Sequence, residues 1–525
     1  MSASAVKGAV FFGSAQQSSP PIETGLNETL GGKGASLVQM TRLGLSVPPG
    51  FVLATSVCRD VFERGWQPAH ERLIRSGLAT LEAAVGRTLG SFDNPLLLSV
   101  RSGAATSMPG MMDTVLNVGM TAEVAAGLLA ATGDETFAAD TFHRAAMSQA
   151  EIVAEVSGAD LERCRRAHHP GDLSATINAW AEAHERNHDP VAQVIESIRA
   201  VFRSWNLPRA QKYREVEHIP DDLGTAAVIQ QMVFGNMPGR SGTGVAFTRD
   251  PASGAKGMFG DFLERAQGED VVDGRHDTSR LTELDRRWPD LASELATAAS
   301  TLEHHYQDMV DIEFTIEGGT LYLLQARAGK RSPEAAFRIA VELAEDSEFE
   351  VDREEAVRRC RHLLADKSER ISGSDAGSDT VLAVGLPASP GRASGVLAVD
   401  LDDAIKRSVR GQDVVLARPT TTPSDVAGMV EAVALITTHG GLVSHAAVVA
   451  RSWGLPAVVG ATDITVCSDG IAVGGEMVAV GTLVTVDGST GEVMVGAAGT
   501  ERQTIPAAQT LLAWSEAMVA EGGRS

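Results

Sequence analysis

A histidine that follows two glycines and a serine is the first feature of the sequence that suggests chemistry. His445 lies in the stretch TTHGGLVSHAAVVARSWGLPAVVG, where Gly440 and Gly441 permit a tight loop and Ser444 precedes a helical pattern. At a helix N-terminus the positive end of the dipole disfavours imidazolium, so a ring nitrogen is left free to act as a nucleophile. A structural cap is the alternative interpretation of a lone histidine at this position.

A second candidate is the segment VDIEFTIEGGTLYLLQAR, which has the pattern of a β-hairpin. Asp311 and Glu313 on the first strand, like Gln325 and Arg327 on the second, are odd-numbered and alternate with apolar residues. A three-residue loop over residues 318–320 would place Glu313 opposite Gln325 and put all four on one face. Oxygen ligands beside a guanidinium suit Mg²⁺ that carries nucleotide phosphates. The alternative is an exposed sheet face with a cross-strand ion pair.

Two glycine-containing segments have the character of phosphate-binding sites. In LGGKGASLVQMTRLGL, Lys33 follows two glycines and precedes a helical pattern, so backbone N–H groups and an ammonium could meet a phosphate. The spacing does not match the P-loop motif, so this segment is a weak signal alone. In LLLSVRSGAATSMPGMMDTVLNVG, Arg101 ends a strand-like run and small residues follow it. An isolated arginine at a strand end is commonly a surface charge.

The elements that position these residues predict an α+β protein of several domains. Residues 5–330 alternate strand-like runs (AVFFG, PLLLSV, AAVIQQMVFG) with helical patterns (AEVAAGLLAATG, PVAQVIESIRAVFRSW). A helical stretch with Ser332 as N-cap and a flexible linker at residues 372–380 lead to a compact β-rich domain with a single helix around HAAVVARSW. The predicted domains are 1–330, 331–383, 384–497 and 498–525.

The composition of the 525 residues narrows the classes of partner. A net charge of −23 disfavours nucleic acid, and no apolar run reaches the ~20 residues that span a bilayer. The N-terminus lacks the pattern of a secretory signal, so we expect a cytoplasmic protein without a membrane partner. Its four cysteines are widely spaced, which indicates reduced, structural thiols. Other histidines, among them His168, lie in polar stretches and are expected to be solvated.

Taken in order, these segments resemble the pyruvate phosphate dikinase family. The similarity continues through MVFGNMPGRSGTGVAFTRDPASG, RAQGEDVVDG, GLPASPGRASG, TTPSDVAGM and GGLVSHAAVVARSWG, and covers residues 10–497. The resemblance implies an ATP-grasp nucleotide-binding domain followed by a small β/β/α swivelling phosphohistidine domain. It implies an enzyme that uses ATP and Mg²⁺ to phosphorylate its own His445, with inorganic phosphate as second acceptor and pyruvate as the final one.

The resemblance also implies roles for individual residues. The phosphates of ATP would be bound by Lys33, Arg101 and Arg327. Arg327 would also stabilise the transferring group, and Arg101 is likewise assigned a catalytic role. The magnesium ligands would be Glu313 and Gln325, to which Asp311 is added from the hairpin pattern. The remaining nucleotide contacts would be Gln230, Met232 and Val233 on the adenine side, and Glu269.

The chain departs from the family pattern in two ways. His439 and Val443 replace the family's arginine and threonine, and only 28 residues follow Ala497, whereas the family's pyruvate-binding TIM barrel needs about 250 residues. We therefore expect a separate barrel protein to supply the acceptor site; a homo-oligomer is compatible with the sequence. One alternative is transfer to a different small molecule or a protein, as in rifampicin phosphotransferases. The other is a nucleotide-sensing partner subunit.

Overall fold

The chain forms two compact units in a computed structural model. The residues described are 8–14, 25–106, 108, 111–184, 187–216, 218–272, 278–365, 369–373, 380–422, 425–497 and 499–522. The first unit comprises Met1–Ser241 and Thr315–Ala326, and the second comprises Gly242–Phe314 and Arg327–Ser525. Each unit mixes helices and strands, which confirms the predicted α+β class. The domain boundaries expected from the sequence stay predictions.

The core of the first unit is a five-stranded sheet of order β1-β2-β7-β5-β6. Its strands are β1 (Ala9–Phe12), β2 (Gly50–Leu53), β7 (Ala226–Gln231), β5 (Leu98–Gly103) and β6 (Thr114–Val118). All neighbouring strands are antiparallel. Their apolar side chains pack with those of α3 (Pro68–Val85) and α8 (Pro190–Ser204), so the predicted runs AVFFG, PLLLSV and AAVIQQ become strands because they bury these side chains.

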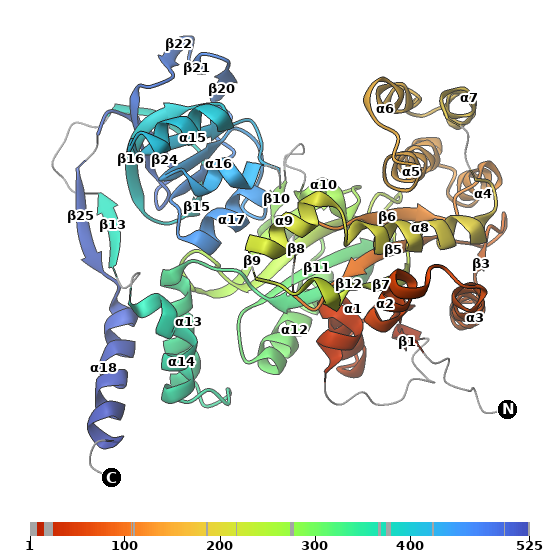
Figure 1. Ribbon diagram of the computed structural model, residues 1–525, viewed down its shortest axis with the longest axis horizontal. Coiled ribbons are helices and arrows are strands. Elements are labelled where there is room, and N and C mark those ends of the chain that lie inside the picture. The colour runs from red at the N-terminus through yellow and green to blue at the C-terminus, as the bar shows by residue number, and fades with distance from the viewer. Residues whose placement is uncertain are drawn as a thin grey trace. The chain divides into compact units, whose positions relative to one another are not determined.

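A group of helices in the first unit packs around its own apolar cluster (gold in Figure 1). The group comprises α4 (Ala122–Thr132), α5 (Glu135–Ser148), α6 (Gly158–Arg165) and α7 (Leu173–Ala183). Side-chain oxygens of Thr121, Asp134 and Asp172 accept hydrogen bonds at the starts of α4, α5 and α7. The other elements of this unit are α1 (Leu26–Arg42), α2 (Thr55–Arg64), β3 (Thr88–Leu89), β4 (Pro95–Leu96), η2 (Gln149–Val153), α9 (Pro208–Val216) and η3 (Asp221–Leu223).

Within this helical group the prediction for His168 is wrong. Its ring stacks on that of His143 with centroids 4.4 Å apart, and its Nε2 is buried without a partner among the described residues. Trp180 donates from Nε1 to Nδ1 of His143 at 3.0 Å. The polar neighbours of His168 in the sequence hid a tertiary contact with α5, which sequence position alone does not reveal.

A second five-stranded sheet has the order β10-β9-β8-β11-β12. Its strands are β8 (Gly242–Arg249), β9 (Lys256–Glu264), β10 (Ser279–Arg280), β11 (Val310–Glu317) and β12 (Thr320–Ala328), with the helices α10 (Gly268–Val272), α11 (Leu281–Arg287) and α12 (Pro289–Tyr306). The predicted hairpin is present, but its three-residue loop is wrong. Gly318 and Gly319 alone connect the strands, with φ of 57° and 85°, the left-handed backbone of a two-residue hairpin turn.

Three helices of the second unit, α13 (Pro333–Glu345), α14 (Arg353–Leu364) and α18 (Pro506–Gly522), pack side by side (Figure 1). Ser332 caps α13, as predicted, by accepting a hydrogen bond from Ala335 N at 3.1 Å. The start of the predicted linker is wrong, because Ser372 and Gly373 belong to β13 (Glu369–Gly373), which pairs with β25 (Thr500–Thr504). Residues 374–379 of that linker lie outside the described residues.

The β-rich region that carries His445 is built on an eight-stranded sheet, order β14-β24-β23-β16-β17-β18-β19-β15. The strands are β14 (Thr380–Val384), β15 (Leu386–Ser389), β16 (Arg392–Ala398), β17 (Val414–Arg418), β18 (Ala434–Thr437), β19 (Ala457–Val459), β23 (Leu483–Asp487) and β24 (Glu492–Val495), with a small sheet of β20 (Ile464–Cys467), β21 (Gly470–Val473) and β22 (Glu476–Ala479). The prediction of a single helix is wrong. Besides α17 (His445–Trp453), the structure has α15 (Leu401–Val409) and α16 (Val426–Val430).

Candidate active site

His445 is the first residue of α17, as the sequence predicted. Ser444 precedes it with extended backbone, and the apolar face of the helix is buried through Ala446, Ala447 and Ala450. Burial lowers the pKa of the His445 imidazole, and Lys330 lowers it further, whereas Asp425 raises it. The predicted direction is therefore confirmed, but its main cause is desolvation, which the sequence argument had assigned to the helix dipole.

Thr421 orients the imidazole. Its Oγ1 lies 3.2 Å from Nδ1 of His445. When Nδ1–H donates to this hydroxyl, the neutral ring keeps its lone pair on Nε2, the nitrogen that can then attack an electrophile. The loop that holds Thr421 is fixed by Asp425, whose Oδ2 accepts from Thr422 N at 2.6 Å and from Thr422 Oγ1 at 2.9 Å. The site thus contains a largely neutral imidazole and a hydroxyl group that can orient it.

The loop before His445 packs against β9 of the same unit. Asp261 Oδ2 accepts a hydrogen bond from Val443 N at 3.3 Å. A Cβ atom on Gly441 would lie 2.2 Å from Asp261 Oδ2 and 2.6 Å from Thr278 Oγ1, so only glycine fits there. The side chain of Val443 is buried in a cluster that includes Val245 and Phe247 of β8, an apolar contact at the position of the family's threonine.

The hairpin brings the buried Asp311 and the partly exposed Arg327 into an ion pair. Asp311 Oδ2 accepts from Nε of Arg327 at 2.9 Å and from Nη2 at 2.8 Å, while its Oδ1 is buried without a partner among the described residues. Burial raises the pKa of Asp311, and the charge of Glu313 raises it further against the opposing effect of Arg327. Asp311 is 4% exposed, so the alternative of an exposed, solvated sheet face is wrong.

The structure reports less on the rest of the predicted metal set. Glu313 is half-buried and lies within electrostatic reach of both members of the ion pair. Gln325 is 8% exposed and belongs to the first unit. Among the described residues no group of three or more histidine, cysteine or acidic side chains could hold a metal ion. The pairing of Glu313 with Gln325, and the metal site, stay predictions.

In the first unit, backbone contacts bring the segments of Lys33 and Arg101 together. Gly32 N donates to Ala104 O at 2.8 Å, and a Cβ atom on Gly31 would lie 1.8 Å from Gly103 O. Gly31 has a φ of 67° and interrupts α1 two residues before Lys33. The predicted glycine loop is therefore a kink in a helix, and it lies against the end of β5 just beyond Arg101.

The same helix is linked to the predicted metal-binding strand. Ser36 Oγ accepts a hydrogen bond from Ala326 N at 2.9 Å. Ser36 lies one turn after Lys33 on α1, and Ala326 directly follows Gln325 on β12. Thus the first unit gathers three predicted residues, Lys33, Arg101 and Gln325, from segments far apart in the chain. Each is at least half-buried.

Of the residues predicted to contact adenine, Gln230 and Met232 make hydrogen bonds to neighbouring backbone in the first unit. Gln230 is buried and its Nε2 donates to Pro48 O at 3.0 Å, while Met232 N donates to Leu97 O at 2.8 Å. Val233 is buried beside them, and Glu269 is an exposed residue of α10 in the second unit. Nucleotide contacts of these four residues stay predictions.

Three residues of the site escaped the sequence analysis: Thr421, Asp425 and Asp261. Thr421 and Asp425 belong to the quoted segment TTPSDVAGM, so the similarity had marked the segment without giving either residue a role. Asp261 ends the run GAKGMFGD on β9, and no spacing links it to His445. Only the tertiary structure brings it to the loop of Val443.

Comparison with known proteins agrees with this description. The model of the AMP/ATP-binding domain of pyruvate phosphate dikinase matches residues 71–288 and 279–348, and that of the mobile domain of PEP-utilising enzymes matches 410–491. The chain is 42% identical to pyruvate, phosphate dikinase 2 of Zea mays over 90% of its length and 56% of that protein. It is 40% identical to pyruvate, phosphate dikinase of Rhizobium meliloti over 89% of its own length and 56% of that protein. It is 38% identical to pyruvate, phosphate dikinase of Clostridium symbiosum over 94% of its own length and 59% of that protein.

These matches define a protein that joins a nucleotide-binding domain to a mobile domain of PEP-utilising enzymes. The chain belongs to the pyruvate phosphate dikinase family. It spans between half and three fifths of the length of the relatives named above. Among the described residues, no helix is long and apolar enough to cross a membrane.

Proposed function

We propose that this chain is an ATP-dependent phosphotransferase that phosphorylates its own His445. The observation that carries the proposal is the imidazole at the start of α17, with a pKa lowered by burial and Nδ1 beside Thr421 at 3.2 Å. A neutral imidazole with one nitrogen oriented by a hydroxyl is a competent nucleophile near neutral pH. The family membership of the chain supports phosphorus as the electrophile.

The proposed chemistry has two displacements. Nε2 of His445 attacks the β-phosphorus of ATP, the bond from that phosphorus to the α-phosphate oxygen breaks, and AMP leaves. An oxygen of inorganic phosphate then attacks the terminal phosphorus of the pyrophosphorylated histidine. That step releases pyrophosphate and leaves phosphohistidine. Catalysis of both steps depends on stabilising the charge on the phosphoryl oxygens.

We assign that stabilisation to cationic and metal-binding side chains. In the first unit, Lys33 and Arg101 bind phosphate oxygens beside the glycine kink of α1. In the second unit, Arg327 stabilises the transferring group. Gln230, Met232, Val233 and Glu269 remain the proposed contacts to the rest of the nucleotide.

Mg²⁺ is the proposed cofactor. The buried Oδ1 of Asp311, which has no partner among the described residues, and the neighbouring Glu313 offer the hard oxygen donors that this ion prefers. Gln325 is proposed as a third ligand. Bound there, the ion would neutralise charge that develops on the phosphates. Arg327, paired with Asp311 at 2.8 Å, favours the ionised carboxylate and so opposes the effect of burial on its pKa, and the ionised form is the one that would bind a cation.

Pyruvate is the proposed final acceptor of the phosphoryl group. Support comes from the names of the relatives, which are pyruvate, phosphate dikinases, and from the mobile-domain match at 410–491. A different small molecule or a protein is the alternative acceptor. We propose the cytoplasm as the location of the reaction.

Labelled ATP tests the proposal. With Mg²⁺ and inorganic phosphate, [β-³²P]ATP should label the protein at one acid-labile, base-stable site, whereas [γ-³²P]ATP should deliver its label to pyrophosphate. His445→Gln should abolish the label while nucleotide still binds, and Glu313→Ala should slow labelling at least tenfold. A label retained in His445→Gln would remove this histidine from the mechanism. Pyruvate is added last, with and without a barrel protein, and phosphoenolpyruvate is measured.

A further inference from the structure

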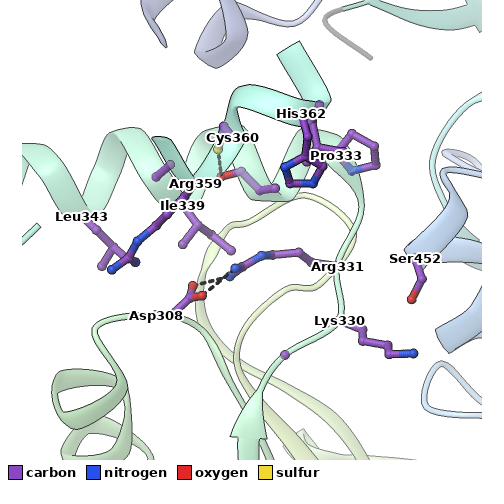
Figure 2. A pocket seen from close by; sticks show the side chains of 14 residues that line it. Asp308, Lys330, Arg331, Pro333, Ile339, Leu343, Arg359, Cys360, His362 and Ser452 are labelled. Atoms are coloured by element: carbon purple, nitrogen blue, oxygen red, sulfur yellow. Dashed lines mark hydrogen bonds and ion pairs between the residues drawn. The ribbon is translucent and has the colours of Figure 1, made fainter. Parts of the chain in front are cut away.

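A cavity of about 350 Å³ lies in the second unit between α13, α14 and the segment that follows β12 (Figure 2). Ser452 of α17 completes its lining, so the cavity adjoins the helix that His445 begins. This volume is within the range of sites for small organic ligands. None of the predicted ATP or metal residues lines it, which separates it from the site described above.

The lining has an excess of positive charge. Lys330, Arg331 and Arg359 line the cavity, and among the described lining residues Asp308 is the only carboxylate, although Arg359 also pairs with Glu355. This excess lies in a chain with 68 acidic and 45 basic residues. A local cluster of cations in an acidic protein raises the concentration of anions at that place.

The cations are held in place by the protein. Arg331 donates from Nη2 to Asp308 Oδ2 at 2.6 Å, and a second bond from Nη1 makes the pair bidentate (Figure 2). Arg359 donates from Nη1 to Gln307 O and from Nε to Glu355, each at 2.6 Å. Because these bonds fix both guanidinium groups, an incoming anion would not pay the full cost of ordering them.

The lining also has an apolar part. Ile339, Ala340 and Leu343 of α13 and Leu363 of α14 form it. Cys360 adds to this part, because burial raises the pKa of its thiol to about 11 and its Sγ donates to Ala336 O at 3.6 Å. The thiol is therefore a neutral part of the surface at physiological pH, and it carries no covalent chemistry here.

We propose that this cavity binds a small organic anion, with its carboxylate, phosphate or sulfonate group beside Lys330, Arg331 and Arg359 and its apolar body on α13. The apolar part of the lining and the fixed cations are both required, so inorganic phosphate alone or an uncharged apolar molecule binds more weakly. Binding also acts on the neighbouring site. The charge of Lys330 reaches His445, and an anion beside Lys330 reduces the positive charge there.

The test uses 1-anilinonaphthalene-8-sulfonate as the anionic probe and N-phenyl-1-naphthylamine, which lacks the sulfonate, as its uncharged match. We expect saturable, one-site fluorescence enhancement with the sulfonate, at least tenfold tighter than with the uncharged compound. Ala336→Phe fills the cavity and should weaken binding at least tenfold. Lys330→Met should weaken it about fivefold, whereas Lys256→Met, on the exposed part of β9, should leave it unchanged.

Two results would overturn the proposal: equal probe affinity of the wild type and Ala336→Phe, or equal affinity for the two probes. Circular dichroism and thermal unfolding establish that each variant is folded, and Lys330→Met decides the question if Ala336→Phe is not. An effect on His445 phosphorylation rests on the proposed function: the sulfonate should slow labelling of the wild type but not of Ala336→Phe. Binding is measured without ATP, so its failure is distinguishable from failure of the proposed phosphotransfer.

Discussion

Two histidine environments in this molecule have the same electrostatic character and different chemistry. His143 in the helical group of the first unit and His445 at the start of α17 both have a pKa lowered chiefly by burial, to about 4 for His143. Nδ1 of His143 accepts from Trp180 Nε1, so the neutral ring carries its proton on Nε2 and has no lone pair left to donate. His445 can place its proton on Nδ1 toward Thr421 and keep the lone pair on Nε2. Burial thus makes an imidazole neutral, but its hydrogen-bond partner decides whether it is a nucleophile.

The strongest test of this contrast is a pair of matched substitutions. His445→Gln should reduce labelling by ATP at least ~1000-fold, because the nucleophile is lost, and should leave the melting temperature within about 2 °C. His143→Gln should leave labelling within about twofold and lower the melting temperature by several degrees, since it breaks a buried stack. Labelling and thermal unfolding are measured on both variants. Loss of labelling in folded His143→Gln would contradict the separation of the two roles.

The orienting hydroxyl gives the next effect in size. Thr421→Val should slow phosphorylation of His445 roughly 10- to 50-fold, because the ring loses the acceptor that favours the reactive tautomer. Thr421→Ser should restore most of the rate, which a purely structural role of the threonine methyl group would not allow. Thr297→Val, on the exposed face of α12, is the matched control. The measurement is the single-turnover rate across pH 5.5–8.5.

The helical group should lose stability in acid. The pKa of His143 is lowered from 6.5 to about 4 by burial and by the charges of His168 and Arg144, so the folded state resists protonation. The contribution of neutral His143 to the free energy of unfolding is complete above pH 6.5. It is lost as pH falls from 6.5 toward 4, and the loss is on the order of 2 kcal/mol. Urea unfolding of the first-unit helices at pH 7 and pH 5 measures this loss. His143→Phe should flatten the dependence, and an unchanged slope would place the acid sensitivity elsewhere.

Trp180 provides the smallest effect. Trp180→Phe removes the donor to His143 Nδ1 and should reduce the free energy of unfolding by about 1 kcal/mol or slightly more. The freed nitrogen should also titrate at a higher pH, which NMR of the imidazole can follow. An unaltered His143 titration in this variant would mean that the hydrogen bond does not hold its tautomer.

Sequence reasoning predicted the elements of the hairpin better than its connection. Alternating polar and apolar residues predict β11 and β12, although in β11 the polar Asp311 and Thr315 are buried along with the apolar residues between them. The loop length depends on whether Gly318 and Gly319 both adopt left-handed backbone, which glycine permits but does not require. The two helices α15 and α16 were missed for a related reason. Each is under ten residues long, too short for a periodic pattern to stand out.

The site residues divide in the same way. The proposed role of His445 as nucleophile came from the family resemblance, but its place at the start of a helix could be predicted from the diglycine loop and the helical pattern on either side of it. Thr421 and Asp261 could not, because each acts on the histidine segment from a distant part of the chain. His168 was misread because its neighbours in sequence are polar while its neighbour in space is an aromatic ring. Local chemistry is readable from sequence, whereas partners contributed by packing are not.

Because β13 pairs with β25, the region between these two strands, which carries His445, could be removed or exchanged as one piece. Glu369–Gly373 and Thr500–Thr504 run antiparallel, and Gly373 faces Thr500 across the ladder. The points where the chain leaves and returns are therefore neighbours in space, and removal of the intervening residues leaves two ends that an Asn-Gly turn can join. Such a deletion would retain α13, α14 and α18. Conversely, the pairing of β13 with β25 offers a junction for grafting another domain onto this protein.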